Sequence, residues 1–479
     1  MRIVMLLQGE WIRESRVVRE AECLASAGYR VDVICLRMAN KGARQERNGV
    51  TYHSIPYEGL RTLPRLVTAL KIHLKILSLG AQWRNRSLRV RGVLGLSFGL
   101  IASLLSIAVA AMTLPAAVVG KMLVSLARAT TWRAGDRLGQ RLKRPMTYFV
   151  QPFSHLNGFG VMCRDLMAQL GPSIVHAHDL VTLSAGALAA KQRGCPLIYD
   201  AHELETHTNY PWLNKWTKYW VARYEDVLIG RATSVVTVSD SIADWLATEY
   251  VIERPRVVLN SPAGPSPVLS GSDSPERLRS RLGLTADTPL VVHVGWVTVE
   301  RGLDRCVQAL QHLPGAHFAV VGPRYDATEM EMTQVARDLG LENRIHFVDP
   351  VPHEQVMSFI ASADCSVIAI QNVSLNNYFC FPNKLLDSVM AGLPVVVANL
   401  RELRRFVERY DVGVVMDETD PLSIAAATRE VLANAARYRP SRAKIADIEQ
   451  HFGWLAQQKQ LLKVYRGLVA PTAGRGELR

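Results

Sequence analysis

Residues 376–394 read NNYFCFPNKLLDSVMAGLP and lead into the apolar run Val395–Val397. A proline suits the first turn of a helix, because its φ is already close to the helical value and its missing N–H is not needed there. Gly392 and Pro394 are typical of the end of a helix. The stretch therefore predicts a helix that begins at Pro382 and a buried strand that follows it.

The start of this predicted helix combines an amide, a cation and a carboxylate. Asn383 and Lys384 lie at its positive end, where free backbone N–H groups can bind phosphate oxygens, and Asp387 follows one turn later. The combination suits a nucleotide diphosphate with a polyol attached. An ordinary helix with a proline start and a glycine stop is the alternative, and the spacing alone does not separate the two.

Apolar strands alternate with helical patterns along the chain, which is typical of doubly wound α/β domains. In the first half we predict strands at Ile3–Leu7, Val31–Cys35, Thr51–Ile55, Ile174–His176, Leu197–Asp200 and Ser234–Val238, and a helix at Arg16–Ala27. After a stretch rich in Pro, Ser and Gly, we predict strands at Leu290–Val294, His317–Val321, Ile345–Val348, Cys365–Ile370, Val395–Ala398 and Gly413–Val415. The 479 residues are enough for two such domains, which would meet at a cleft beside the carboxyl ends of their strands.

The net charge of +13 comes from a single segment of the chain. Residues 61–150 contain 15 Lys and Arg but only one acidic residue, Asp136, which gives the segment a charge of +14. Within it, residues 92–120 have no charged side chain. Because this segment interrupts the α/β alternation, we interpret it as an insertion.

Three interpretations of the insertion compete. A membrane-spanning helix has the necessary length, but cations flank the apolar run on both sides, which the positive-inside rule disfavours for a single pass. A hairpin that lies on the membrane or dips into it agrees with both the apolar run and the cations, which anionic lipids attract. A buried core hairpin of a soluble protein is the third, and so many cations would be unusual there. We therefore expect residues of about 84–144 to contact a membrane surface.

Several other classes of protein are disfavoured. The seven cysteines are scattered and form no CxxC pair, so neither a disulfide framework nor a zinc site is expected. The N-terminus becomes polar too soon for a signal peptide and is interpreted as a buried first strand. Nucleic-acid binding is not expected, because a long apolar run has no place on a surface that tracks phosphates. With the insertion, these features predict a peripheral or monotopic protein at the cytoplasmic face of the inner or plasma membrane.

The predicted strands of the second half end in loops with glycine or polar residues. Gly295 opens the first of these loops, and Arg301, just before Gly302, could reach a pyrophosphate. Gly322 and Arg324 follow the next strand and would allow a ring to approach closely. A single glycine after a strand is usually only a turn, but loops of this kind in series favour a nucleotide site.

The first half places histidines and carboxylates directly after two strands. The two clusters are His176-Ala177-His178-Asp179 and Asp200-Ala201-His202-Glu203. Such groups at strand ends can transfer protons, stabilise charge or hydrogen-bond a sugar or phosphate. Metal binding ranks lower, because the i, i+2 spacing presents both histidines only if the end of the strand is irregular. Histidines that merely hydrogen-bond neighbouring backbone remain an alternative.

These motifs together resemble the GT-B glycosyltransferases, and most closely the large retaining family 4, whose members use nucleotide sugars. The resemblance covers nearly all of the chain outside the insertion. It rests on the N-terminal strand and the helix with Arg16, both histidine clusters, Val236-Thr237-Val238-Ser239, the Gly295 to Gly302 turn, Phe381 to Pro394, and Gly453-Trp454. It implies an α/β protein with two Rossmann-like, doubly wound domains that face a cleft.

The resemblance also implies a division of the chain into parts. We expect an N-terminal acceptor domain at 1–262 with the insertion at about 61–150, a linker at 263–283, a nucleotide-sugar domain at 284–452, a helix at 453–470 that crosses back to the first domain, and a tail at 471–479.

Family positions map onto this sequence residue by residue. Arg301 and Lys384 would bind the donor diphosphate and, with Asn383, stabilise charge on it as it leaves. Asp387 would bind the nucleotide ribose, and His178 would lie beside the reacting sugar. The supporting residues on the acceptor side would be Arg16, Asp179, His202 and Glu203.

The sequence departs from the family pattern at two positions. Phe379 replaces an acid that would bind the donor sugar, and Trp296 replaces the first basic residue of the phosphate turn. Asn376, Asn377 and Tyr378, which we expect in a loop, could contact the sugar instead.

The resemblance implies a glycosyltransferase that moves a sugar, with retention, from a UDP- or GDP-linked donor to a hydroxyl group. No metal or other cofactor is expected. With the insertion, it suggests a lipid-linked acceptor or a cell-envelope glycan precursor. Two alternatives remain open: a nucleotide-sugar isomerase or hydrolase of the same fold, and a non-catalytic membrane adaptor with a degenerate site.

Overall fold

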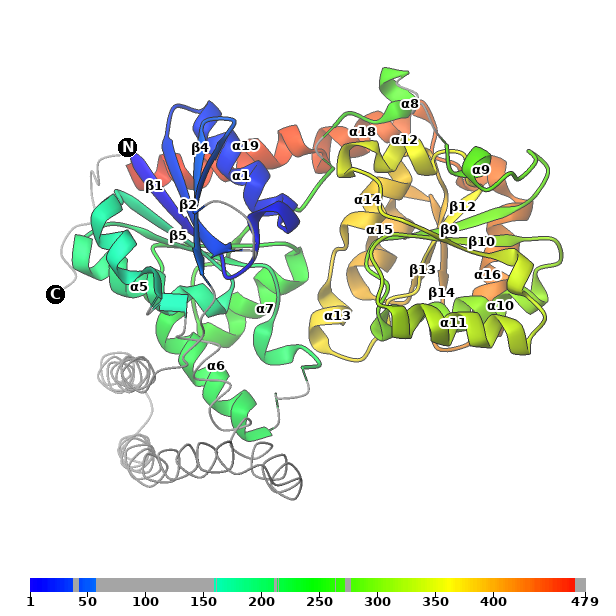
Figure 1. Ribbon diagram of the computed structural model, residues 1–479, viewed down its shortest axis with the longest axis horizontal. Coiled ribbons are helices and arrows are strands. Elements are labelled where there is room, and N and C mark those ends of the chain that lie inside the picture. Colours follow the sequence, from blue (N-terminus) through cyan, green and yellow to red (C-terminus); the bar gives the residue numbers. More distant parts are fainter. Residues whose placement is uncertain are drawn as a thin grey trace, which may run out of the picture. The chain divides into compact units, whose positions relative to one another are not determined.

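The computed structural model forms two compact units (Figure 1). One unit comprises Met1–Val235 and Tyr250–Ile252, and the other comprises Val236–Glu249 and Glu253–Arg479. The structure describes residues 1–37, 43–56, 159–160, 162–210, 213, 215–262, 264–271 and 277–469. The predicted insertion, including the membrane contact at about 84–144, and the predicted tail at 471–479 lie outside the described residues. Among the helices that are described, none is long and apolar enough to span a membrane.

The first sheet has eight strands in the order β3-β4-β2-β1-β5-β6-β7-β8. They are β1 (Arg2–Leu6), β2 (Arg30–Arg37), β3 (Arg44–Arg47), β4 (Val50–Pro56), β5 (Ile174–His178), β6 (Leu197–Ala201), β7 (Ser234–Thr237) and β8 (Arg256–Val257). β3 pairs antiparallel with β4, whereas the central strands pair in parallel. β5 and β6 are buried along their whole length, as expected for parallel strands that are covered on both faces.

The predicted strands of the first half are all present. The helix predicted at Arg16–Ala27 is α1 (Ser15–Ser26), and Gly28 follows it with φ +87°. The other helices around this sheet are η1 (Trp11–Arg13), α5 (Leu180–Arg193), η2 (Glu205–His207), α6 (Lys215–Ile229) and α7 (Asp240–Tyr250). The edge strand β3 was not predicted, because its sequence RQER is polar and mostly exposed.

The second sheet has six strands in the order β11-β10-β9-β12-β13-β14, and all of them pair in parallel. They are β9 (Leu290–Val294), β10 (His317–Val321), β11 (Ile345–Val348), β12 (Cys365–Ile368), β13 (Val395–Ala398) and β14 (Gly413–Met416). The chain builds outward from β9 in one direction and then returns to β12 on its other side. The carboxyl ends of β9 and β12 therefore form a topological switch point, where open α/β sheets bind ligands.

Helices cover both faces of the second sheet (Figure 1). Their bounds are α8 (Pro267–Ser270), α9 (Leu278–Arg281), η3 (Val299–Arg301), α10 (Leu303–Ala309), η4 (Leu310–His312), α11 (Asp326–Asp338), η5 (Glu342–Arg344), η6 (His353–Gln355), α12 (Val356–Ile360), α13 (Leu375–Phe379), α14 (Asn383–Met390), α15 (Arg401–Tyr410), α16 (Pro421–Ala433), α17 (Ala435–Tyr438), α18 (Arg442–Phe452) and α19 (Trp454–Val469). One core lies beneath α12, α14, α15 and α18, and the other beneath α10, α11 and α16. α8 and α9 lie within the predicted linker, and α19 corresponds to the helix predicted at 453–470.

Two local predictions around α14 need correction. Pro382 is not the first helical residue but the N-cap, with extended backbone at φ −77° and ψ 140°; its carbonyl accepts the hydrogen bond from the N–H of Leu385, so the helix begins at Asn383. The stretch with Asn376, which was expected to be a loop, is the short helix α13. Ser374 caps α13, because its hydroxyl accepts the N–H of Asn377 at 3.1 Å.

Candidate active site

The switch point of the second sheet begins with a tight turn at Gly295, directly after β9. Gly295 has φ +112°, a value that favours glycine, and its N–H donates to the carbonyl of Val321 at 2.9 Å. The turn after β10 packs against it, since a Cβ on Gly322 would lie 2.8 Å from the carbonyl carbon of Gly295. The structure therefore gives Gly322 a packing role between two neighbouring turns.

The side chain of Lys384, the second residue of α14, extends to this turn. Its side chain is only 9% exposed, and a Cβ on Gly295 would lie 3.4 Å from its Nζ. The Nζ lies 3.2 Å from Nε2 of His293, a fully buried residue of β9. Nδ1 of His293 in turn lies 3.2 Å from the carbonyl oxygen of Val367 in β12. The amine is thus held at the point where β9, β12 and α14 meet.

Arg301 adds a second cation at the same place. It ends η3, and the following Gly302 has φ +61°; a Cβ there would lie 2.7 Å from the carbonyl oxygen of Ala369. The Nε of Arg301 is buried and has no hydrogen-bond partner in the described parts of the chain. Burial, followed by the charge of Arg301, lowers the pKa of Lys384 well below its usual value. The predicted pair of phosphate-binding cations is therefore brought together.

The other predicted residues of α14 differ in accessibility. Asn383 is the first residue of the helix and is half-buried, so it is placed as predicted at the positive helix end. Asp387 lies on the second turn and is only 5% exposed; its charge opposes the lowering of the Lys384 pKa. Its predicted contact with the ribose stays a prediction.

A carboxylate that sequence reasoning missed lies next to α13. Nδ2 of Asn377 donates to the carbonyl oxygen of Gln371 at 3.0 Å and lies 3.5 Å from Oε2 of Glu300. Glu300 precedes Arg301 in η3, so it places an acid beside the predicted phosphate ligands. Asn376 and Tyr378 lie on α13 and are half-buried, while Phe379, which occupies the position of the missing acid, is buried.

Arg324 does not join the cation pair. Its guanidinium donates to Glu329 and, at 3.0 Å, to Oδ1 of Asp349, so its charge is matched by two carboxylates. Two exposed aromatic rings lie near this turn instead. Trp296 and Tyr325 are 43% and 60% exposed, with ring centroids 5.7 Å apart.

An open hollow of about 460 Å³ also lies in this unit. It is lined by Asn372, Asn399, Arg404, Glu408, Val415, Met416, Asp417 and Glu418. None of these was predicted as a site residue, and none belongs to the cation pair.

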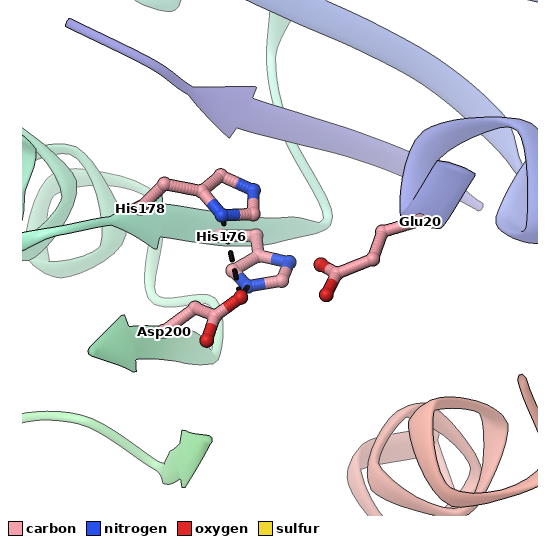
Figure 2. A group of neighbouring side chains, drawn as sticks. All are labelled: Glu20, His176, His178 and Asp200. Atoms are coloured by element: carbon pink, nitrogen blue, oxygen red, sulfur yellow. Dashed lines mark ion pairs between the residues drawn. The ribbon is translucent and has the colours of Figure 1, made fainter. Parts of the chain in front are cut away.

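The first unit has a second polar cluster, which is centred on the buried Asp200 at the end of β6 (Figure 2). Arg16 from α1 binds both of its oxygens, with Nη2 2.9 Å from Oδ1 and Nε 3.0 Å from Oδ2. Nε2 of His202 lies 3.2 Å from Oδ2, and Nδ1 of His178 lies 3.4 Å from the same atom. Burial alone would raise the pKa of Asp200, but Arg16 and then His202 hold it well below its usual value.

His202 bridges this carboxylate to a second one. Its Nδ1 lies 3.3 Å from Oδ2 of Asp179, and although burial opposes the charge, Asp179 and Asp200 raise the pKa of His202 well above its usual value. Asp179 has φ 61° and ψ 161°, a backbone region that is essentially restricted to glycine and costs about 1–3 kcal/mol. Strained residues of this kind cluster at functional sites. Glu203 is exposed at the edge of the cluster.

His178 is oriented as a hydrogen-bond acceptor. Nδ1 of His178 lies 3.4 Å from Oδ2 of Asp200 and 3.2 Å from Nε2 of His202. With the ring proton placed on Nδ1, where the carboxylate accepts it, the lone pair of the ring lies on Nε2. Its Nε2 is buried and has no hydrogen-bond partner among the described residues. Burial lowers the pKa of His178 despite the opposing effect of Asp200, so the ring is neutral. A neutral imidazole with one nitrogen oriented by a carboxylate and a lone pair on the other can accept a proton.

Four buried side chains of this cluster have the donor atoms of a metal site. Ligand atoms of Glu20, His176, His178 and Asp200 all lie within 4.8 Å of one another (Figure 2). The expectation that an irregular strand end is needed to present both histidines was wrong, because both lie in the regular strand β5 and residues two apart in a strand share a face. However, Arg16 binds both oxygens of Asp200, and its Nη2 lies 3.1 Å from Oε1 of Glu20. A divalent cation would therefore have to replace or repel a guanidinium that already compensates both carboxylates. The residues fit the arginine better than a metal ion.

Comparisons with known proteins agree with this architecture. The family model described as Glycosyltransferase Family 4 matches residues 122–261, and the one described as Glycosyl transferases group 1 matches residues 288–434. A D-inositol 3-phosphate glycosyltransferase of Xylanimonas cellulosilytica is 28% identical over 302 residues, which cover 61% of this chain and 71% of that protein.

Solved structures show the same fold at lower identity. A sucrose-phosphate synthase from Thermosynechococcus elongatus aligns with a TM-score of 0.64 and 16% identity, over 98% of this chain and 99% of that chain. The Anabaena protein HepE, solved in complex with UDP-glucose, aligns with a TM-score of 0.61 and 15% identity, over 98% of this chain and 100% of that chain. The two α/β units and both family matches confirm the expected resemblance. The chain belongs to the GT-B glycosyltransferases of group 1 and is similar to family 4.

Proposed function

We propose that this glycosyltransferase binds a nucleotide diphosphate sugar at the carboxyl ends of β9 and β12. The observation that carries the proposal is the pair formed by Arg301 and Lys384. Two positive charges placed close together and largely out of water would destabilise each other, and Lys384 has a neutral histidine, not a carboxylate, as its hydrogen-bond partner. A diphosphate would supply the missing negative charge.

The same residues would promote cleavage of the bond between the sugar and the diphosphate. As that bond breaks, negative charge develops on the leaving diphosphate, and preorganised cations stabilise it. Arg301 and Lys384 supply these charges, and the N–H groups at the start of α14, beside Asn383, add a partial positive charge.

The acceptor hydroxyl would bind at the first unit. His178 offers the acceptor atom Nε2, and Asp200 holds its ring in the tautomer that leaves this atom unprotonated. In this scheme His178 accepts the hydroxyl hydrogen bond, while His202 and Asp179 fix the surrounding charges. Retention at the sugar carbon is part of the proposal and rests on the resemblance to family 4.

Two relatives support a nucleotide sugar as donor and a hydroxyl group as acceptor. HepE was solved with UDP-glucose, and the Xylanimonas relative is named for transfer to D-inositol 3-phosphate. We further propose that the acceptor is a lipid-linked or cell-envelope glycan precursor at the cytoplasmic face of a membrane. The support is the +14 charge and the apolar run of residues 61–150, which attract anionic lipid.

A thermal-shift panel tests the donor site directly. UDP, GDP, ADP and their glucose conjugates are added to the full chain, since a ligand at about 100 times its Kd stabilises the native state by about 2.7 kcal/mol. At least one diphosphate is expected to raise the Tm, and the Arg301→Ala variant is expected to lose that rise. If no nucleotide raises the Tm of the wild type, or if Arg301→Ala responds equally, the donor site is wrong.

Vesicle sedimentation tests the membrane proposal separately. The full chain is expected to sediment with vesicles that contain anionic lipid, and to do so less at high salt, because screening weakens the attraction of exposed cations. A variant without residues 84–144 should stay in the supernatant. Equal sedimentation of both proteins would refute membrane contact through this segment.

A further inference from the structure

The amine of Lys384 is held by a chain of two hydrogen bonds that begins in the sheet. Nδ1 of His293 lies 3.2 Å from the carbonyl oxygen of Val367, which can only accept, so the ring proton lies on Nδ1. Nε2 therefore carries a lone pair, and this lone pair faces Nζ of Lys384 at 3.2 Å. His293 has no exposed surface, and its place in β9 together with the hydrogen bond to β12 fixes its ring.

The titratable groups that face Lys384 come from four places. His293 approaches from β9, Arg301 from η3, Cys380 from the segment before α14, and Asp387 from within α14. Burial and the charge of Arg301 lower the pKa of Lys384 well below its usual value, and the opposing effects of Cys380 and Asp387 are smaller. In the described part of the chain, Lys384 forms no ion pair, and its one hydrogen-bond partner is His293.

We propose that His293 positions Lys384 for the donor and that binding of the donor diphosphate adds one proton from solvent to the Lys384 amine. The inference rests on the proposed function. In the free protein the neutral amine donates one N–H to Nε2 of His293. When the diphosphate binds, the lone pair of the amine takes up a proton, and the new N–H points to a phosphate oxygen. The bond to His293 is kept in both states.

The consequence is a specific dependence of donor affinity on pH. A nearby dianion favours the charged amine, so the pKa of Lys384 is higher in the complex than in the free protein. Between these two values the complex holds one more proton than its separate parts. The Kd for a nucleotide diphosphate therefore rises by about tenfold for each unit of pH within that window.

Calorimetric titration with UDP measures this proton directly. The full chain is titrated at pH 8 in two buffers that differ in ionisation enthalpy, and the difference in heat gives the number of protons taken up. At pH 8 the terminal phosphate, whose pKa is about 6, is already ionised. We expect about one proton per UDP for the wild type and none for Lys384→Met. If UDP binds to the wild type without proton uptake, the inference is wrong.

Two variants separate positioning from folding. His293→Phe removes the acceptor and is expected to raise the Kd for UDP about tenfold. His293→Gln restores a neutral acceptor and should recover most of the affinity. His317→Phe is the matched control, because His317 is the first residue of β10, at the opposite end of the strands, and pairs with His346.

The outcomes distinguish this inference from the proposed function. If His293→Phe binds UDP as His317→Phe does, or if His293→Gln is no better than His293→Phe, His293 has no positioning role. If the wild type itself binds none of the nucleotide diphosphates in the panel, the proposed donor site fails first.

Discussion

Replacing Asp200 with Asn tests the cluster of the first unit most sharply. Oδ2 of Asp200 faces Nε of Arg16 at 3.0 Å, Nε2 of His202 at 3.2 Å and Nδ1 of His178 at 3.4 Å. These groups can all donate, so an amide NH₂ in place of Oδ2 would meet donors only, and an amide turned round would present its NH₂ to Nη2 of Arg16. Removing one partner of a buried ion pair costs about 3–5 kcal/mol, and we expect the first unit to lose this much stability.

The substitution should also change the chemistry at His178. Without the carboxylate, the proton of His178 is free to move from Nδ1 to Nε2, which removes the acceptor at the hydroxyl site. General base catalysis contributes about 10²–10⁴-fold, so kcat is expected to fall by about 100-fold or more. The Kd for UDP should not change, because the proposed donor residues belong to the other unit.

A matched control separates stability from chemistry. Asp32 in β2 is also buried and pairs with an arginine and a histidine, at 3.3 Å from Nε of Arg2 and 2.8 Å from Nε2 of His53. Asp32→Asn should therefore destabilise the first unit and leave kcat nearly unchanged at a temperature where the variant is folded. Urea unfolding, turnover and UDP titration are measured for both variants. If Asp200→Asn keeps wild-type turnover, or loses no more of it than Asp32→Asn does, the proposed role of the cluster is refuted.

Three further predictions concern single positions. Gly302→Ala should weaken UDP binding and lower the Tm, because a Cβ would collide with Gln371 and the carbonyl of residue 369. Gly283→Ala, with a similar φ of +65° and no atom of the described residues within 4 Å, should lose only the backbone cost of about 1 kcal/mol of unfolding free energy and so lower the Tm less. Equal effects in the two variants would contradict the expectation. Burial raises the pKa of Glu225 to about 7. Its contribution to stability is therefore complete below its unfolded pKa of about 4.3 and is lost as pH rises through about 7, by up to about 4 kcal/mol. Glu225→Gln should make the free energy of urea unfolding less dependent on pH between pH 5 and pH 8, by about one proton, and an unchanged slope would rule this out. Glu300→Gln should raise the KM for the nucleotide sugar about tenfold or more if its carboxylate binds a sugar hydroxyl, and the Kd for UDP should not change. An unchanged KM would show that Glu300 does not bind the sugar.

The strands were largely predictable from the sequence. Strands β9, β10, β11 and β13 have the predicted bounds, because buried parallel strands are continuous apolar runs that end at glycine, proline or polar residues. The edge strand β3 has no such run, and α13 is only five residues long, so neither produces a periodic signal. The predicted start of α14 was one residue too early, because a proline that precedes a helix satisfies the same preference as one that begins it.

The candidate site was predictable only where its residues follow strand ends. Arg301 and Lys384 converge because β9 and β12 are neighbours at the switch point. His293 was missed because it lies inside an apolar run and looks like a core residue; its contact with Lys384 joins residues 91 positions apart. Arg324 was predicted as a donor ligand, but its two carboxylate partners could not be identified without the fold.

The strained backbone of Asp179 lowers the stability of the first unit, whereas its side chain serves the proposed reaction. Asp179→Gly would release about 1–3 kcal/mol of conformational cost, against the loss of the pair with His202, whose side chains are largely buried. Where the released strain outweighs the lost pair, a laboratory selection for heat resistance alone would collect this substitution and, with it, a slower enzyme. Engineers who want a robust catalyst from this scaffold should hold position 179 fixed and look for gains elsewhere.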